Sequence, residues 1–196
     1  MHIIVGLGNP GKEYDATRHN VGFETIDLLS RRNNIEIKRL KHKALCGEGN
    51  IGGKKVMLVK PQTFMNLSGQ SLQDMVQFYK IDTKNITVVY DDVDIELGSI
   101  RVREKGSSGS HKGMQSIIYQ IQTDQFPRVR IGIGGPQFED LSNYVLSRFS
   151  QEEISIILEA IEKAALACET IVTDGVLSAM NKYNEKSMGS DTVADQ

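Results

Sequence analysis

The sequence predicts a single-domain α/β protein in which α-helices are packed around a β-sheet. Apolar runs of strand length alternate along the chain with segments whose apolar residues recur at helical spacing. The length of 196 residues suits one domain and is enough to bury a core of useful size. The chain contains no internal repeat.

The chain opens with an expected strand that leads toward a helix. Residues 2–5 form an apolar run that Gly6 ends, which is typical of a buried strand. Further on, Phe23, Ile26 and Leu29 form an apolar stripe along one helical face that points toward residue 31.

A β-hairpin is expected next. Residues 44–51 and 55–59 flank Gly52-Gly53, and glycine accepts the positive φ angles that a tight hairpin turn requires. Pro61 ends the second strand of this hairpin.

The middle of the chain combines helices and strands. Apolar residues at positions 72, 75, 76 and 79 have the i, i+3, i+4, i+7 spacing of one helical face. Two further strands are expected at 86–90 and 99–103, and a glycine- and serine-rich loop at 106–110 precedes an expected helix at 113–122.

The last third begins with a strand at 129–133 and contains the clearest helix. Ser150 and Glu153 form a capping box, in which each side chain satisfies a backbone N–H of the other residue. Gly175 stops this helix, and a short helix at 176–183 follows. The apolar face of the long helix is expected to consist of Ile154, Ile157, Leu158, Ile161, Ala165, Cys168 and Val172. We place the domain at 1–184 and expect the polar segment 185–196 to be a disordered tail.

Composition excludes several classes of protein. A net charge of −2 excludes a uniformly basic nucleic-acid coat, although it allows a local basic surface. Two cysteines are too few for a disulfide scaffold, so we expect a reducing cytoplasmic compartment. No apolar run approaches the roughly 20 residues of a membrane span, and the first residues lack the charged start of a signal peptide.

The opening segment VGLGNPG matches the glycine spacing of a dinucleotide-binding loop. That loop needs a helix that starts inside the motif with free N–H groups, and here Pro10 removes one donor. The expected acidic residue at the end of a second strand is also missing. We therefore expect the glycines to make a tight turn rather than a cofactor site.

Among the histidines, His19 is the strongest candidate for a catalytic role. A catalytic role requires a carboxylate partner, and Asp91, at the end of an expected strand, is a candidate. The alternative is that His19 only caps a helix or lies on the surface. Asp91, Asp92 and Asp94 could also form a metal cluster, but no fourth ligand accompanies them, and turn or helix capping explains the three carboxylates better.

Three further features suit a nucleic-acid ligand. Residues 60–69 lie between a strand and a helix and place an aromatic, a methionine and an amide on one loop, although these could be core or capping residues. The loop at 106–110 precedes a helix and could bind an anion through free N–H groups. Basic residues at 38–43, 101–105, 112 and 128–130 could form a one-sided phosphate-binding face, although solvation alone explains each of them.

Taken together, these segments resemble the bacterial-type peptidyl-tRNA hydrolases. The resemblance runs from residue 3 to about residue 184, and its five motifs occur in the family's order. They read VGLGNPGKEYDATRHNVG, KPQTFMNLSGQS, VVYDDVDIELGSIRVR, GSSGSHKG and RVRIGIGGP.

The resemblance implies a monomeric, cytoplasmic α/β enzyme with a mixed, twisted β-sheet surrounded by helices. Such an enzyme hydrolyses the ester between a peptide and the terminal ribose of tRNA, which recycles tRNA from abandoned synthesis. Its partner is the acceptor arm and 3′ end of peptidyl-tRNA, and no metal or other cofactor is implied.

The same resemblance assigns roles to individual residues. His19 becomes the general base that activates water, and Asp91 keeps it basic. Asn9 contacts the peptide near the ester and helps to reject unblocked aminoacyl-tRNA. The implied residues for binding substrate and tRNA are Tyr14, Phe64, Met65, Asn66, Arg103, His111, Lys112 and Arg130.

One position departs from the family pattern. Where the family usually reads His-Asn-Gly, this chain reads His111-Lys112-Gly113. Two other classes of function remain open at this stage. They are a non-catalytic RNA-binding relative, which intact His19, Asp91 and Asn9 disfavour, and a dinucleotide-dependent oxidoreductase.

Overall fold

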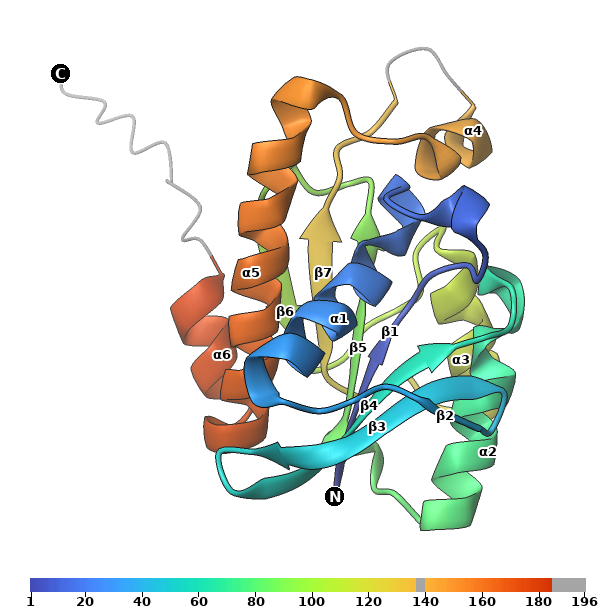
Figure 1. Cartoon of the computed structure of the whole chain (residues 1–196), viewed down its shortest axis with the longest axis vertical. Coiled ribbons are helices and arrows are strands. Elements are labelled where there is room, and N and C mark those ends of the chain that lie inside the picture. The colour runs from blue at the N-terminus through green and yellow to red at the C-terminus, as the bar shows by residue number, and fades with distance from the viewer. Residues whose placement is uncertain (137–139, 185–196) are drawn as a thin grey trace, which may run out of the picture.

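The computed structural model describes residues 1–136 and 140–184, and the expected tail at 185–196 lies outside the described residues. Within this part, one mixed sheet has the strand order β2-β3-β4-β1-β5-β7-β6 (Figure 1). The inner strands β4, β1, β5 and β7 are parallel, whereas β2, β3 and β6 pair antiparallel to their neighbours. The strands are β1 (His2–Gly6), β2 (Arg39–Lys41), β3 (Ala44–Ile51), β4 (Lys54–Pro61), β5 (Ile86–Asp92), β6 (Ile100–Arg103) and β7 (Arg128–Gly132).

Helices cover both faces of the sheet, and the expected α/β fold is confirmed (Figure 1). One layer consists of α1 (Val21–Asn33), α5 (Gln151–Asp174) and α6 (Val176–Tyr183), and the other of α2 (Ser68–Tyr79) and α3 (Lys112–Ile121). The short α4 (Leu141–Leu146) lies beyond the strand ends. Four 3-10 turns complete the described elements: η1 (Lys12–Tyr14), η2 (Arg18–Asn20), η3 (Met65–Leu67) and η4 (Thr83–Asn85).

The apolar strands separate two cores. Along β1, Ile4 faces the core under α1 and α5, whereas Ile3 and Val5 face the core under α2 and α3. Successive side chains of a strand point to opposite faces, so a strand that is covered on both faces must be apolar throughout. This explains why residues 2–5 form an uninterrupted apolar run.

Two elements carried no usable sequence signal. All three residues of β2 are exposed, so this edge strand shows no apolar alternation. The helix α4 has six residues and none of them is buried, and six residues are too few to show a repeating apolar face. Both elements form because tertiary neighbours pair with them or pack against them.

The predicted apolar face of α5 was partly wrong. Ile154 and Leu158 are exposed by 40% and 58%. The buried stripe instead includes Ala160, Ala164 and Ala167, small residues that allow the helix to approach its neighbours closely. The face that contacts the core is therefore rotated away from Leu158.

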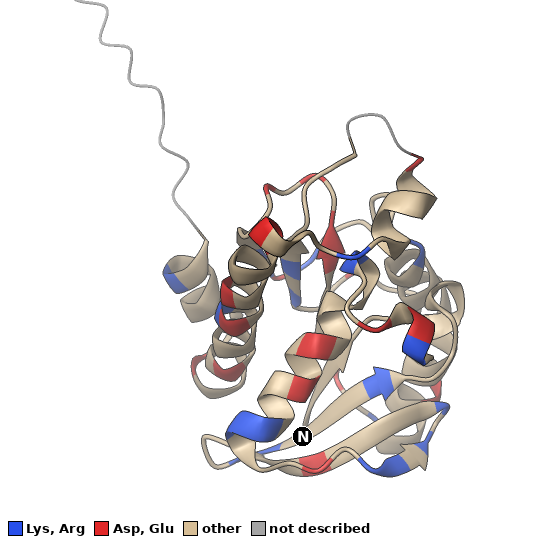
Figure 2. Cartoon of the chain, turned by 45° about the horizontal axis from the view of Figure 1, so that its top comes forward, with Lys and Arg blue, Asp and Glu red and all other residues tan. Residues whose placement is uncertain are grey.

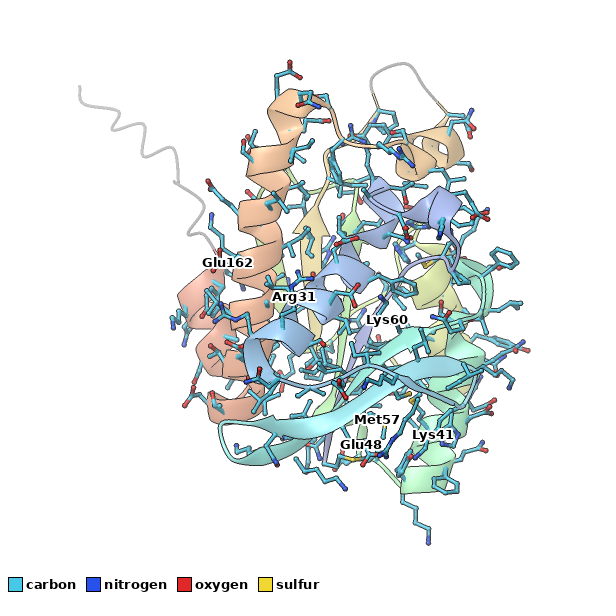
Figure 3. All side chains as sticks on the ribbon, viewed as in Figure 1. Arg31, Lys41, Glu48, Met57, Lys60 and Glu162 are labelled. Atoms are coloured by element: carbon cyan, nitrogen blue, oxygen red, sulfur yellow. The ribbon has the colours of Figure 1, made fainter. Side chains whose placement is uncertain are left out.

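The prediction that the basic residues form one face of the protein was also wrong. The basic residues near β2 and those near β6 lie at opposite edges of the sheet. Near β2 the charges are largely neutralised locally, and Lys41 lies beside Glu48 with Nζ and Oε1 3.6 Å apart (Figure 3). Arg128 is 1% exposed and donates to the backbone oxygens of Ser107 and Asp124, so it serves the fold rather than a ligand. Acidic positions meanwhile lie along α1 and α5 (Figure 2).

Candidate active site

A cleft of about 590 Å³ opens outside the carboxyl ends of β1 and β5. Ligands of α/β sheets bind at this edge, because loops that leave neighbouring strands diverge there. The cleft is lined by residues 9, 19, 64–66, 90–94, 103, 105–112, 128, 130, 141, 142, 145 and 146. Most of the residues that the sequence singled out therefore meet here, including Asn9, His19 and Asp91.

Asp91 joins two histidines at the base of this cleft. The Nδ1 atom of His19 lies 2.9 Å from each carboxylate oxygen of Asp91, and Nε2 of His111 lies 3.0 Å from Oδ1. The His19 and His111 ring centroids are 5.0 Å apart. The pairing of His19 with Asp91 that the sequence proposed is thus present, although 72 residues separate the two.

The hydrogen bonds fix the tautomer of both rings. His111 is the N-cap of α3, where its Nδ1 accepts the backbone N–H of Met114 at 3.3 Å. Its Nε2 must therefore carry the proton that it donates to Asp91. His19 donates its Nδ1–H to the same carboxylate, so in the neutral ring Nε2 carries the lone pair and lies at the cleft wall.

Asp91 is 2% exposed, and burial alone would raise the pKa of its carboxyl. The nearby His111 and His19 outweigh burial through charge and hydrogen bonding, so the pKa lies well below its usual range. Asp91 therefore remains an anion and an acceptor for both rings.

Asn9 is held by a reciprocal pair of amide contacts. Its backbone N–H donates to Oδ1 of Asn20 at 2.8 Å, and Nδ2 of Asn20 donates back to its carbonyl at 3.0 Å. The side-chain Oδ1 of Asn9 accepts the backbone N–H of Met65 at 2.8 Å. Because that N–H requires an acceptor, the Nδ2 of Asn9 is the group that remains for a ligand in the cleft.

The glycines after β1 allow the backbone to lie against α1. A Cβ atom at Gly6 would lie 2.2 Å from the carbonyl oxygen of Gly22, so only glycine fits. The helix α1 begins at Val21, ten residues after Gly11, whereas a dinucleotide-binding loop needs a helix that starts inside the glycine motif. The prediction that the loop is a tight turn rather than a dinucleotide site agrees with this geometry.

The loop around η3 divides its residues between the cleft and the core. Phe64 and Asn66 are exposed and line the cleft, whereas Met65 is 5% exposed and packs in the core under α2 and α3 while touching the cleft. Tyr14 is not part of the cleft lining. Its ring contacts Phe64 edge-on at a centroid distance of 6.5 Å, so it supports that side chain.

The cations of the cleft differ in their surroundings. Arg103 and Lys112 are exposed, and neither forms an ion pair with a described residue. Arg130 is half-buried, with its Nε 2.6 Å from Oδ2 of Asp92. The charge and hydrogen bond of Asp92 more than offset partial burial and raise the pKa of Arg130.

The acidic cluster proposed from the sequence does not assemble. Asp92 pairs with Arg130 and accepts the backbone N–H of Asp94, while Asp91 points toward the histidines. Among the described residues, the group with metal-ligand chemistry is His19, Asp91 and His111, whose ligand atoms lie within 4.8 Å of one another. Hydrogen bonds already account for the atoms that face one another in this group.

Some residues of the site have roles that the sequence did not predict. His111 was expected to bind substrate, but its side chain is 8% exposed and both ring nitrogens are already engaged. Its position as N-cap of the helix after the glycine-serine loop was the available signal. Asn20, Arg18 and the wall formed by α4 offered none, because their partners lie far away in the sequence.

Known proteins are similar to this chain in sequence and in fold. A family model described as Peptidyl-tRNA hydrolase matches residues 3–191. The chain belongs to the peptidyl-tRNA hydrolase family. A peptidyl-tRNA hydrolase of Alkaliphilus oremlandii is 71% identical over 184 residues, which cover 94% of this chain and 100% of that protein. One of Alkaliphilus metalliredigens is 61% identical with the same coverage. The solved peptidyl-tRNA hydrolase of Acinetobacter baumannii superposes with a TM-score of 0.88 at 39% identity and covers 94% of both chains.

Proposed function

We propose that this enzyme hydrolyses the ester of peptidyl-tRNA with His19 as the general base. One observation carries the assignment: Asp91 binds the Nδ1 side of His19, and no described residue bonds its Nε2 at the wall of the cleft. An ester is an activated substrate, so a positioned base and water suffice without a covalent intermediate. General-base assistance of this kind contributes roughly 10²–10⁴ in rate.

The reaction proceeds in two steps. Nε2 of His19 takes a proton from water as its oxygen attacks the ester carbonyl carbon, which produces a tetrahedral oxyanion. Asp91 stabilises the imidazolium that forms. The oxyanion then collapses, the bond to the ribose oxygen breaks, and the proton held by His19 passes to that oxygen. The products are a peptide carboxylic acid and tRNA with a free hydroxyl.

Asn9 is proposed to act beside this base. Its Nδ2 amide points to the cleft because Met65 holds its Oδ1, so it can donate to the ester carbonyl or to the peptide next to it. Removal of one such donor typically costs 10²–10³ in kcat. A donor here also disfavours the ammonium group of unblocked aminoacyl-tRNA.

The tRNA is proposed to bind along the exposed side of the cleft. Arg103, Lys112 and Arg130 supply positive charge for phosphates of the acceptor arm, and Phe64 and Asn66 receive the 3′ end and peptide. None of the described helices is both long and apolar enough to cross a bilayer. A cytoplasmic, monomeric enzyme without a metal or organic cofactor remains our expectation.

Cleavage of a blocked aminoacyl-tRNA by wild type and His19→Ala tests this function. We expect kcat to fall by about 10²-fold or more, with little change in tRNA affinity. His42→Ala is the matched control, because this histidine packs on Phe78 and Tyr79 and does not line the cleft. A folded His19→Ala variant with near-normal turnover would contradict the assignment. A wild-type protein that binds tRNA without cleaving the ester would favour the non-catalytic RNA-binding alternative.

A further inference from the structure

Arg18 adjoins the proposed base in the sequence but extends away from it. It is 7% exposed in η2, and its side chain reaches the segment that follows α4. Its Nε donates to Oγ of Ser147 at 3.2 Å, and its Nη2 donates to Oε2 of Glu153 at 2.7 Å. A buried arginine that donates to two partners about 130 residues away indicates a specific link between two distant segments.

Two aromatic rings also pack against the guanidinium group of Arg18. The guanidinium carbon lies 4.5 Å from the ring centroid of Tyr144 and 4.6 Å from that of Phe149. Planar guanidinium groups stack on aromatic faces, whereas a lysine ammonium supplies only a point charge. The site therefore matches the shape of arginine as well as its charge.

The backbone reinforces the same junction. The Arg18 N–H donates to the carbonyl of Ser147 at 2.9 Å, and Thr17 forms a β-bridge with Arg148. Glu153 is itself fixed, because it accepts the Ser150 N–H at 2.8 Å in the capping box of α5. Arg18 thus ties η2 to a rigid helix start.

The far end of this link is a wall of the active-site cleft. The helix α4 lies against η2 (Figure 1). It lines the cleft through Leu141, Ser142, Val145 and Leu146. Tyr144 anchors α4 to the residue that follows β7 through a 2.7 Å hydrogen bond from its hydroxyl to the carbonyl of Ile133. The residue that stacks on Arg18 therefore also holds this wall.

We infer that Arg18 is a positioning residue for the hydrolysis, which sets the distance between the base His19 and the α4 wall of the cleft. The inference rests on the proposed function. A displaced wall lets the substrate settle with its ester away from Nε2 of His19, and a displacement near 1 Å can cost about 10²-fold in rate. The arginine acts through His19 and α4 and does not touch the reacting atoms.

Arg18→Lys tests this inference by retaining the charge and losing the planar stack. At a temperature well below its Tm we expect kcat to fall about 10-fold or more, because the ester and the base are misaligned. KM should stay within about 3-fold of wild type, because the tRNA-binding cations are untouched. Phe149→Leu removes one of the two rings that stack on Arg18 and should also lower kcat. It provides the test if Arg18→Lys does not fold.

Two matched controls separate positioning from stability. Arg32 also donates through Nε and Nη2 to one carboxylate, that of Glu169, but it lies near the end of α1 away from His19, so Arg32→Lys should keep the wild-type kcat. Ile171→Ala empties part of the core and should lower Tm while leaving kcat unchanged.

Two results would overturn the inference while leaving the proposed function intact. One is a wild-type kcat in folded Arg18→Lys or, if that variant does not fold, in Phe149→Leu. The other is an equal loss of kcat in Ile171→Ala at the same drop in Tm. Failure of wild type to cleave the ester would instead remove the proposed function itself.

Discussion

Replacement of Asp91 by asparagine should inactivate the enzyme through the tautomer of His19. Asp91 accepts hydrogen bonds from His19 and His111, but the amide of asparagine offers one acceptor oxygen and one donor group. His111 cannot adapt, because its Nδ1 already accepts from Met114 and its Nε2 must keep a proton. The asparagine oxygen therefore goes to His111, and its NH₂ group faces Nδ1 of His19.

Nδ1 of His19 lies 2.9 Å from both carboxylate positions, so an Nδ1–H would face the asparagine NH₂ group as well as its oxygen, and the amide favours the tautomer in which Nδ1 accepts. The ring proton then moves to Nε2, the atom that must take a proton from water. A wrong tautomer in a Ser-His-Asp triad costs about 10⁴ in kcat. We expect a loss of about 10³–10⁴ for Asp91→Asn, equivalent to about 4–5.5 kcal/mol of transition-state stabilisation.

Single-turnover cleavage of a blocked aminoacyl-tRNA at saturating enzyme isolates this effect from binding. Asp92→Asn is the matched control, because Asp92 lies next in the same strand but faces Arg130 rather than the histidines. Its single-turnover rate should remain close to that of wild type. A folded Asp91→Asn enzyme that cleaves within 10-fold of the wild-type rate would refute the tautomer reasoning.

The remaining predictions concern substrate selection, tRNA affinity and acid stability. Asn9→Asp replaces the free amide donor with an anion, so cleavage of blocked substrate should slow by about 10²-fold or more. Discrimination against a free α-ammonium should weaken as well, and unchanged selectivity in a paired assay would count against this role. Lys112→Asn should reduce the slope of log K for tRNA against log salt by roughly 0.7–0.9, because one fewer counterion is released. Parallel salt dependences would show that Lys112 contacts no phosphate. The pKa of Asp91 is lower in the folded protein than its value of about 3.9 in the unfolded chain. The ionised carboxylate therefore stabilises the fold at any pH above about 3.9, and this contribution is lost as the pH falls through the folded pKa. The difference in unfolding free energy between wild type and Asp91→Asn should therefore be constant above about pH 5 and shrink below about pH 4, and denaturant titrations that find no pH dependence would contradict it.

Local patterns in the sequence determined most of the secondary structure. The run at 2–5, the Gly52-Gly53 turn and the Ser150–Glu153 capping box each depend on neighbours a few residues apart, and all three are present. The order of the motifs also indicates the family, because five segments in sequence are specific even where each is weak alone.

Tertiary structure decided how the site works. The sequence offered Asp91 as a partner for His19, but only the fold shows that His111 shares the carboxylate and so fixes both tautomers. It likewise places the two basic segments at opposite edges of the sheet and connects Arg18 to the α4 wall. Periodicity and capping are encoded within one or two turns of chain, so a sequence displays them directly. Contacts such as that between Arg18 and Glu153 depend on how whole elements pack, and no local pattern records which distant residue will fill the space beside a side chain.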